Sequence, residues 1–185
     1  LKRKFFLNLL IISVAIRSVY LTSFLIYLSL RQIKDINYGK INKTFLVLVK
    51  SIGVDDLKIS FQNKKSNINF YQLDRKITKI IFRSFVKKAV YKDYDYNSKN
   101  PQTNSQLKNL QLFLHKVFKT LKIFKNYNAI INFNVFYYGD VELQKVSNKL
   151  GVKFFSIHKE ALKPPLYLKY FKWIYKNTAN KFYGT

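Results

Sequence analysis

The chain has 185 residues, of which 48% are hydrophobic, and its 34 Lys and Arg against 9 Asp and Glu give a formal net charge of +25. This length and apolar fraction predict one packed domain, with or without a terminal appendage, and exclude a disordered polymer. The absence of cysteine excludes disulfide scaffolds, thiolate zinc sites and cysteine nucleophiles, and the two histidines are too few for a multi-histidine metal site. Because the chain opens on Leu1 and stops at Thr185 without a terminal signal, we expect a fragment of a longer protein.

The charge has two explanations. A strongly basic protein gains affinity for nucleic acid by displacing counterions from phosphates. However, Lys, Ile, Asn, Phe and Tyr make up 95 of the 185 residues, and their codons are the richest in A and T. Only 5 of the 34 basic residues are Arg, the residue that clamps phosphate with two hydrogen bonds. This residue usage favours mutational drift in an A+T-rich genome as the origin of the charge, with adhesion to anionic surfaces as a by-product.

The region 1–35 is dominated by a mostly apolar stretch at residues 5–30, flanked by basic residues on both sides. The length is sufficient for a bilayer-spanning helix, but Arg17 divides the stretch near its middle. We therefore expect a hydrophobic N-terminal helix. A bilayer span, a buried core helix and a helix lying on a membrane surface all remain open as its environment.

From Thr44 onward, short strands and amphipathic helices are predicted. Strand-forming residues lie at 45–49, 58–61 and 68–71. Asp74 is placed to cap a helix from Arg75 to about Val90. Residues 91–105 are polar and contain Pro101, which predicts a loop, and the leucine spacing after them predicts a helix over 107–125.

The next segment predicts the fold class. A buried strand at 129–133, a helix at 140–150 and a strand at 152–157 buried on both faces form a compact βαβ unit. The two strands of such a unit are parallel and the crossover is right-handed. The pattern therefore predicts an α/β fold, a Rossmann-like parallel sheet with flanking helices over residues 44–185.

Polar residues follow both strands of this unit. In parallel sheets, ligands bind where the loops at the carboxyl ends of the strands converge. An imidazole, an ammonium and a carboxylate in succession can exchange protons near neutral pH, hold an anion and accept hydrogen bonds from hydroxyls. The alternative is that Lys159 and Glu160 form an exposed pair and His158 merely ends a strand. The polar residues are Asn134, Tyr137, Tyr138, Gly139 and Asp140 after the first strand, and His158, Lys159 and Glu160 after the second.

Three motifs carry a resemblance to a known family: residues 132–134 with Tyr137 and Tyr138, Leu150-Gly151-Val152, and residues 155–160. Together they resemble bacterial surface-carbohydrate biosynthesis proteins, of capsule or envelope polysaccharide, with a two-domain GT-B glycosyltransferase-like fold. The match covers residues 130–162. It implies that this chain is the N-terminal, acceptor-side domain and that a nucleotide-sugar donor binds a second domain beyond Thr185, with no cofactor or metal in this part.

The resemblance also implies roles for the polar residues. His158 and Glu160 are the catalytic candidates, because either could deprotonate or orient an acceptor hydroxyl. Substrate binding is assigned to Asn134, Tyr137, Asp140 and Lys159. The expected partner is a sugar or a lipid-linked sugar, and the expected location is the cytoplasm, including the inner face of the cell membrane.

A second function class is an RNA-binding protein, such as an organelle-encoded ribosomal protein. Its lysines would contact phosphates and its Tyr and Phe rings would stack on bases. The regular α/β pattern, the scarcity of Arg and the lack of an RNA-binding motif argue against it. We therefore expect nucleic acid to bind only non-specifically.

Overall fold

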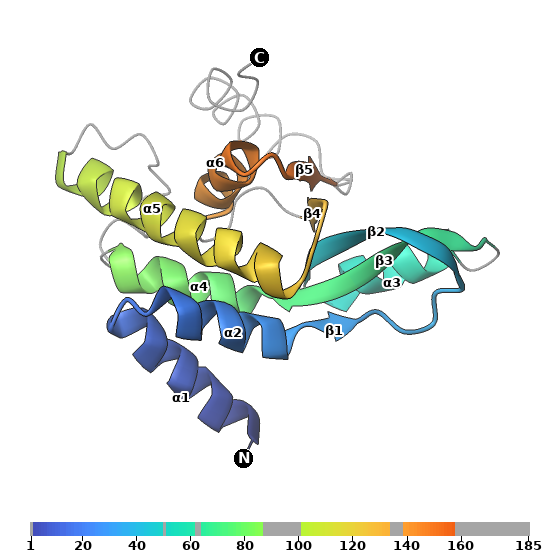
Figure 1. Cartoon of the computed structure of the whole chain (residues 1–185), viewed down its shortest axis with the longest axis horizontal. Coiled ribbons are helices and arrows are strands. Elements are labelled where there is room, and N and C mark those ends of the chain that lie inside the picture. The colour runs from blue at the N-terminus through green and yellow to red at the C-terminus, as the bar shows by residue number, and fades with distance from the viewer. Residues whose placement is uncertain (1, 50, 62–63, 87–100, 134–138, 158–185) are drawn as a thin grey trace, which may run out of the picture.

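The computed structural model describes residues 2–49, 51–61, 64–86, 101–133 and 139–157. Their fold is α/β, with a five-stranded, mostly parallel sheet and flanking helices (Figure 1). The helices are α1 (Lys2–Ala15), α2 (Val19–Ser29), α3 (Ser51–Ser60), α4 (Arg75–Phe85), α5 (Pro101–Phe124) and α6 (Asp140–Lys149). The strands are β1 (Arg31–Gln32), β2 (Tyr38–Val49), β3 (Ser66–Asp74), β4 (Ala129–Asn132) and β5 (Lys153–Ser156).

The sheet has the strand order β1-β3-β2-β4-β5, in which β1 alone is antiparallel to its neighbour. The prediction that the strands flanking α6 are parallel neighbours is confirmed, because Ala129 pairs with Lys153 and Asn132 with Ser156. The chain leaves β2 toward β3 on one side and later returns to β4 on the other side. The order of the parallel strands therefore reverses at β2, an arrangement compatible with a Rossmann-like sheet.

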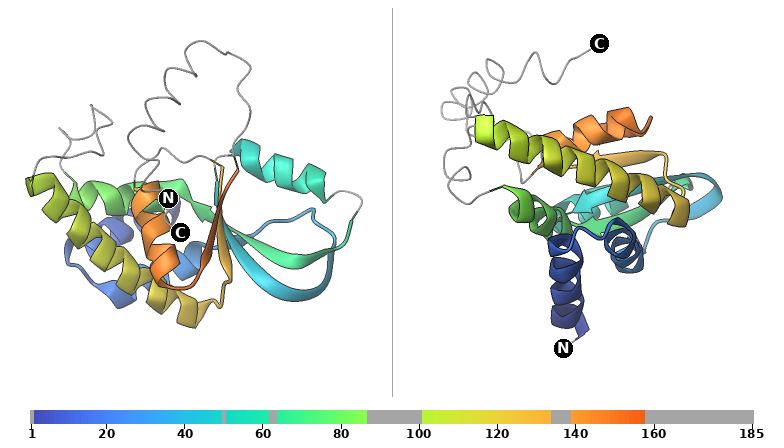
Figure 2. Two further views of the ribbon diagram at one scale, coloured as in Figure 1. Left: turned by 90° about the horizontal axis from the view of Figure 1, so that it is seen from above. Right: turned by 60° about the vertical axis from the view of Figure 1, so that its left-hand side comes forward.

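Helices cover both faces of the sheet, as the view from above shows (Figure 2). Alternate residues of β2 point to opposite faces, so Leu46 and Leu48 pack with α2, α4, α5 and α6, while Val47 packs with α3. Right-handed crossovers require this segregation, because the β2-to-β3 connection runs in the opposite direction from the later ones.

The N-terminal apolar stretch forms two helices, so the expectation of one hydrophobic helix is wrong. Arg17 lies between them with a φ of 57°, a left-handed conformation that ends α1. Its guanidinium donates to the Ser84 carbonyl at 3.0 Å and lies 3.5 Å from the centre of the Phe85 ring. Leu10, Val14, Leu25 and Ile26 are buried in the same core as the sheet. In the part of the chain that the structure describes, no helix has the length and apolar character needed to span a bilayer.

Four other local predictions need correction. Residues 58–61 are not a strand, because Val54 and Leu57 bury one face of α3 against the sheet. Helix α4 ends at Phe85 instead of Val90. Helix α5 begins at Pro101, inside the expected loop, whose residues 91–100 lie outside the described part. Strand β5 is at the sheet edge, and Phe155 is 43% exposed, so this strand is not buried on both faces.

Candidate functional site

Four parallel strands end at one edge of the sheet. The register aligns Val49 of β2 with Asp74 of β3, Leu48 of β2 with Asn132 of β4, and Asn132 with Ser156 of β5. This edge includes the point where the strand order reverses. Ligands of open α/β sheets bind in the crevice outside the strand ends at such a point.

A buried polar cluster lies at this edge and is formed by Arg75, Asn132 and Asp140. The Arg75 Nη1 atom donates to Asp140 Oδ2 at 3.2 Å, and its Nη2 atom donates to the Asn132 side-chain oxygen. The Asn132 side-chain nitrogen donates to the same Asp140 oxygen at 3.0 Å. The side chains of Arg75 and Asp140 are 12% and 2% exposed, so this ion pair is screened little by water.

The local sequence explains why these three groups meet. Asp74 ends β3 and caps α4, since its carboxylate accepts from the Lys76 amide at 2.9 Å, and this places Arg75 at the first position of the helix. Asp140 similarly begins α6, where a carboxylate stabilises the positive end of the helix dipole. Asn132 is the last residue of β4, which lies between the two helix starts in the chain.

Gly139 allows α6 to begin close to α4. Its φ of 84° is in the left-handed region, and an added Cβ atom would lie 2.8 Å from Cδ2 of Phe82. A side chain at position 139 would therefore strain the backbone and also clash with the ring on α4. The close approach of Gly139 to Phe82 keeps the start of α6 beside α4, where Asp140 reaches Arg75.

The cluster can fix the strand ends in one geometry. The cation on α4 is neutralised by the carboxylate on α6, and the amide of Asn132 connects both to the sheet. A buried, mutually hydrogen-bonded network of this kind holds its members in a single arrangement. Its chemical contribution is therefore to position the strand end of β4 and the starts of α4 and α6.

Of the predicted site residues, Asp140 lies in this cluster, and its carboxylate holds Arg75 and Asn132. The other five lie outside the described residues: Asn134, Tyr137, His158, Lys159 and Glu160. The chain segments that lead to them do meet, because the Ile157 amide donates to the Asn132 carbonyl at 2.8 Å.

Arg75 and Asn132 were not among the predicted site residues. Both residues end or follow an apolar strand, as the predicted site residues do. A search for polar residues after each strand, including the strand at 68–71, could have found Arg75. The assignment of 58–61 as a strand hid this signal, because it obscured the first strand–helix–strand unit, β2-α3-β3.

Within the described ranges, no group of three or more His, Asp and Glu residues could hold a metal ion. Comparisons with family models, with curated proteins and with solved structures find no match to this chain. The functional interpretation therefore depends on the site itself and on the sequence motifs.

Proposed function

We propose that this chain is the acceptor-side, Rossmann-like domain of a glycosyltransferase-like protein of surface polysaccharide biosynthesis. The observation that supports this most is the 2.8 Å hydrogen bond from the Ile157 amide to the Asn132 carbonyl. It joins the exits of the two strands that precede the polar segments beginning at Asn134 and His158. One crevice at the carboxyl edge can then be lined by both segments.

The proposed chemistry divides the roles among these residues. The acceptor hydroxyl loses its proton to the Glu160 carboxylate or to the His158 imidazole. The acceptor oxygen then forms a bond to the anomeric carbon of a nucleotide sugar as the bond to the nucleotide diphosphate breaks. Lys159 holds an anionic group of the acceptor, and Asn134 and Tyr137 line the crevice.

Asp140 acts in this proposal as a positioning residue. Its carboxylate is buried and contacts Arg75 and Asn132, so it acts on the crevice through the geometry of the strand ends. The nucleotide-sugar donor binds another domain of a longer protein. A lipid-linked sugar as acceptor fits a protein that works in the cytoplasm at the inner face of the cell membrane.

The test is ligand-observed NMR of the chain with glucuronate and with glucose as probes. We expect saturation transfer to glucuronate, weaker transfer to glucose, and loss of the difference in the Lys159→Ala protein because that ammonium selects the carboxylate. Lys43→Ala is the matched control, because Lys43 is exposed on β2, five residues before Leu48, and lies away from the carboxyl edge.

Absence of transfer to either sugar would contradict the proposal, as would equal losses in the Lys159 and Lys43 variants. Tight, sequence-selective binding to RNA would instead favour the second function class. The two alternatives therefore give different results on the same protein.

A further inference from the structure

Helix α2 buries one face, formed by Thr22, Ser23, Leu25 and Ile26, and presents a second face of aromatic and aliphatic side chains to solvent. Thr22 and Ser23 are buried, and the Ser23 hydroxyl donates to the Val117 carbonyl of α5 at 2.9 Å. The helix contains no charged residue. A helix on the surface of a globular protein usually shows the opposite distribution, with charged and polar residues outward. The outward side chains are Tyr20, Leu21, Phe24, Tyr27 and Leu28.

Aromatic rings join this face to the end of α5. The Phe124 ring centre lies 5.4 Å from that of Tyr20, 6.0 Å from that of Phe24 and 5.8 Å from that of Tyr27. Beside Phe124, Ile123 is 81% exposed. We call the five outward side chains of α2, together with Ile123 and Phe124, the α2 surface.

Exposed apolar side chains concentrate in this part of the molecule. Of the fifteen large hydrophobic residues that are exposed in the described ranges, nine lie between Phe5 and Leu28. The remaining six include Ile123 of the α2 surface. A concentration of this kind marks a binding surface more often than scattered apolar residues do.

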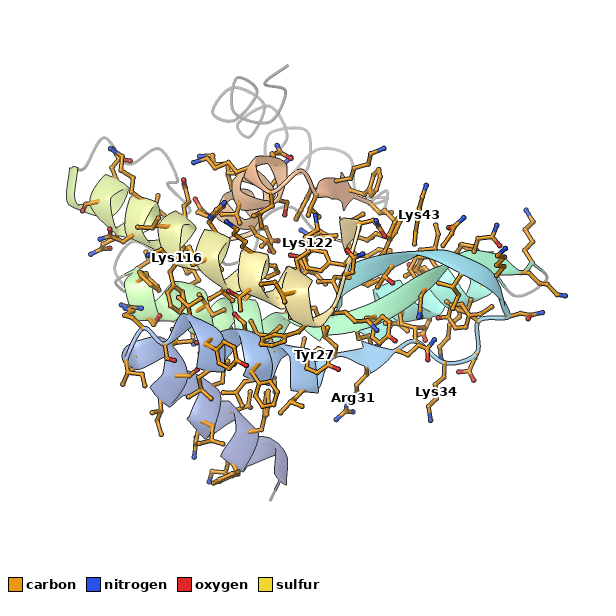
Figure 3. The ribbon with its side chains drawn as sticks, in the orientation of Figure 1. Tyr27, Arg31, Lys34, Lys43, Lys116 and Lys122 are labelled. Atoms are coloured by element: carbon orange, nitrogen blue, oxygen red, sulfur yellow. The ribbon has the colours of Figure 1, made fainter. Side chains whose placement is uncertain are left out.

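The charges around the α2 surface are predominantly positive, and the nearby carboxylate of Asp35 is paired with Lys58. Helices α1, α2 and α5 contain no Asp or Glu, whereas their flanks and faces contain several exposed basic residues. In the view of Figure 3, Tyr27 lies between Lys116 and Lys122 of α5 and the pair Arg31 and Lys34 that follows α2. The exposed basic residues are Lys4, Arg31, Lys34, Lys116 and Lys119, and Lys122 is half-buried.

We propose that the α2 surface docks on an anionic lipid bilayer and lies in its interface without spanning it. Tyr rings favour the boundary between headgroups and acyl chains, while Leu, Ile and Phe enter the apolar layer. The surrounding ammonium and guanidinium groups contact anionic headgroups. The long lysine side chains let their ammonium groups reach the headgroup region while their aliphatic stems lie along the apolar layer.

Charge and side-chain type favour this occupant over two others. A second copy of the chain would bring two strongly basic surfaces together, which charge repulsion opposes. RNA would match the charge and stack on the rings, but aliphatic Leu28 and Ile123 offer it no stacking surface. The inference depends on α1, α2, α5 and the basic residues that follow α2, so it stands independently of the proposed glycosyl transfer.

The experiment is sedimentation of the chain with vesicles of phosphatidylcholine, prepared with and without phosphatidylglycerol. The apolar variant is Tyr20→Ser/Leu28→Ser/Ile123→Ser, which changes three exposed side chains. Its matched control is Ile41→Ser/Ile59→Ser, which removes exposed apolar groups from β2 and α3. The charge variant is Lys116→Glu/Lys119→Glu, matched by Lys43→Glu/Lys64→Glu. Circular dichroism confirms that each variant is folded.

We expect the chain to sediment with phosphatidylglycerol vesicles, more weakly at high salt. Binding should fall by about tenfold or more in the apolar and charge variants and remain unchanged in both controls. The proposal is overturned if the chain does not sediment, or if the controls lose as much as the surface variants. It is also overturned if the apolar variant still binds vesicles but no longer forms a dimer in light scattering, or still binds vesicles but no longer binds polyuridylate.

Discussion

Arg75 and Asp140, 65 positions apart in the sequence, form an ion pair at 3.2 Å between the first residues of α4 and α6. Both helices begin at the carboxyl edge of the sheet, so the pair links two helix starts at the candidate site. Asn132 contacts both members from the end of β4. One buried charge pair therefore holds these two helix starts together.

Removing one member of this pair should destabilise the fold strongly. Arg75→Ala leaves the Asp140 carboxylate buried without its cation, and Asp140→Ala does the reverse. We expect each to lower the free energy of unfolding by about 3–5 kcal/mol, because an uncompensated buried charge is costly. Urea denaturation followed by circular dichroism measures this change.

The double variant should lose less than the sum of the two single losses, since both remove the same interaction. The matched control is Asp35→Asn, because Asp35 pairs with Lys58 at 2.7 Å on the surface and solvent screening leaves such a pair little effect. Additive losses at Arg75 and Asp140, or a control as destabilised as they are, would contradict the prediction.

Two glycines with positive φ allow a second, paired prediction. Gly139→Ala should destabilise the protein by about 2–3 kcal/mol, because a strained backbone and a clash with Phe82 act together. Gly151 has a φ of 64°, but an alanine Cβ atom at this position would have nothing within 4 Å. Gly151→Ala should therefore cost only the backbone strain, about 1 kcal/mol. Thermal unfolding of both variants compares the two costs, and equal losses would argue against the contact with Phe82.

Periodicity predicted the local elements well where one pattern dominates. The leucine stripe of α5, and the β4-α6-β5 unit with its parallel strands, are confirmed. It failed at α3, where Lys58 and Ser60 alternate with Ile59 and Phe61 and imitate a strand. The burial of Val54 and Leu57 on one helical face decides the structure there, and that burial requires the sheet to be present.

Long-range contacts account for what the sequence could not predict. In the sequence, Arg17 is a single charge within one predicted apolar helix. In the structure it binds the Ser84 carbonyl on α4 and lies between two helices. Arg75 and Asn132 belong to the site because α6 returns to α4, a meeting that no local spacing encodes. Asp140 was predicted from its position after a strand, since the edge where parallel strands end follows from topology alone.

Stability should decline in alkaline solution because of Tyr127. Burial raises the pKa of Tyr127, whose hydroxyl donates to the Phe118 carbonyl at 2.9 Å. The unfolded chain releases this proton near pH 10, whereas the folded protein retains it. Stability from this group is therefore complete below about pH 10 and lost as the pH rises further. The Tyr127→Phe protein should show a flatter decline above pH 10 in chemical denaturation. Parallel declines in both proteins would refute the assignment.

RNA binding should be weak and indifferent to sequence. The exposed lysines are spread over α1, β2, α4, α5 and α6, so they provide electrostatic attraction without a groove-reading element. Fluorescence titration against structured and unstructured RNA at physiological salt should give dissociation constants of about 10⁻⁶ M or weaker. A sequence-selective constant near 10⁻⁸ M, which is typical of specific complexes, would support the RNA-binding class instead.

The proposed transfer chemistry makes a final prediction about Glu160 and His158, the residues that follow the strand held to Asn132. In a protein that also carries the donor-binding domain, Glu160→Gln preserves shape and hydrogen bonding but removes the charge and the capacity to accept a proton. If the carboxylate acts as the base, transfer should fall by roughly 10²-fold or more, the scale on which general acid–base groups contribute. The Kd for the acceptor should change much less, because the amide still accepts a hydrogen bond from a hydroxyl.

His158→Ala tests the imidazole in the same assay, and Lys43→Ala serves as the control for a general loss of basic charge. Unchanged turnover in both Glu160→Gln and His158→Ala would show that neither residue is catalytic and would remove the chemical basis of the proposed function.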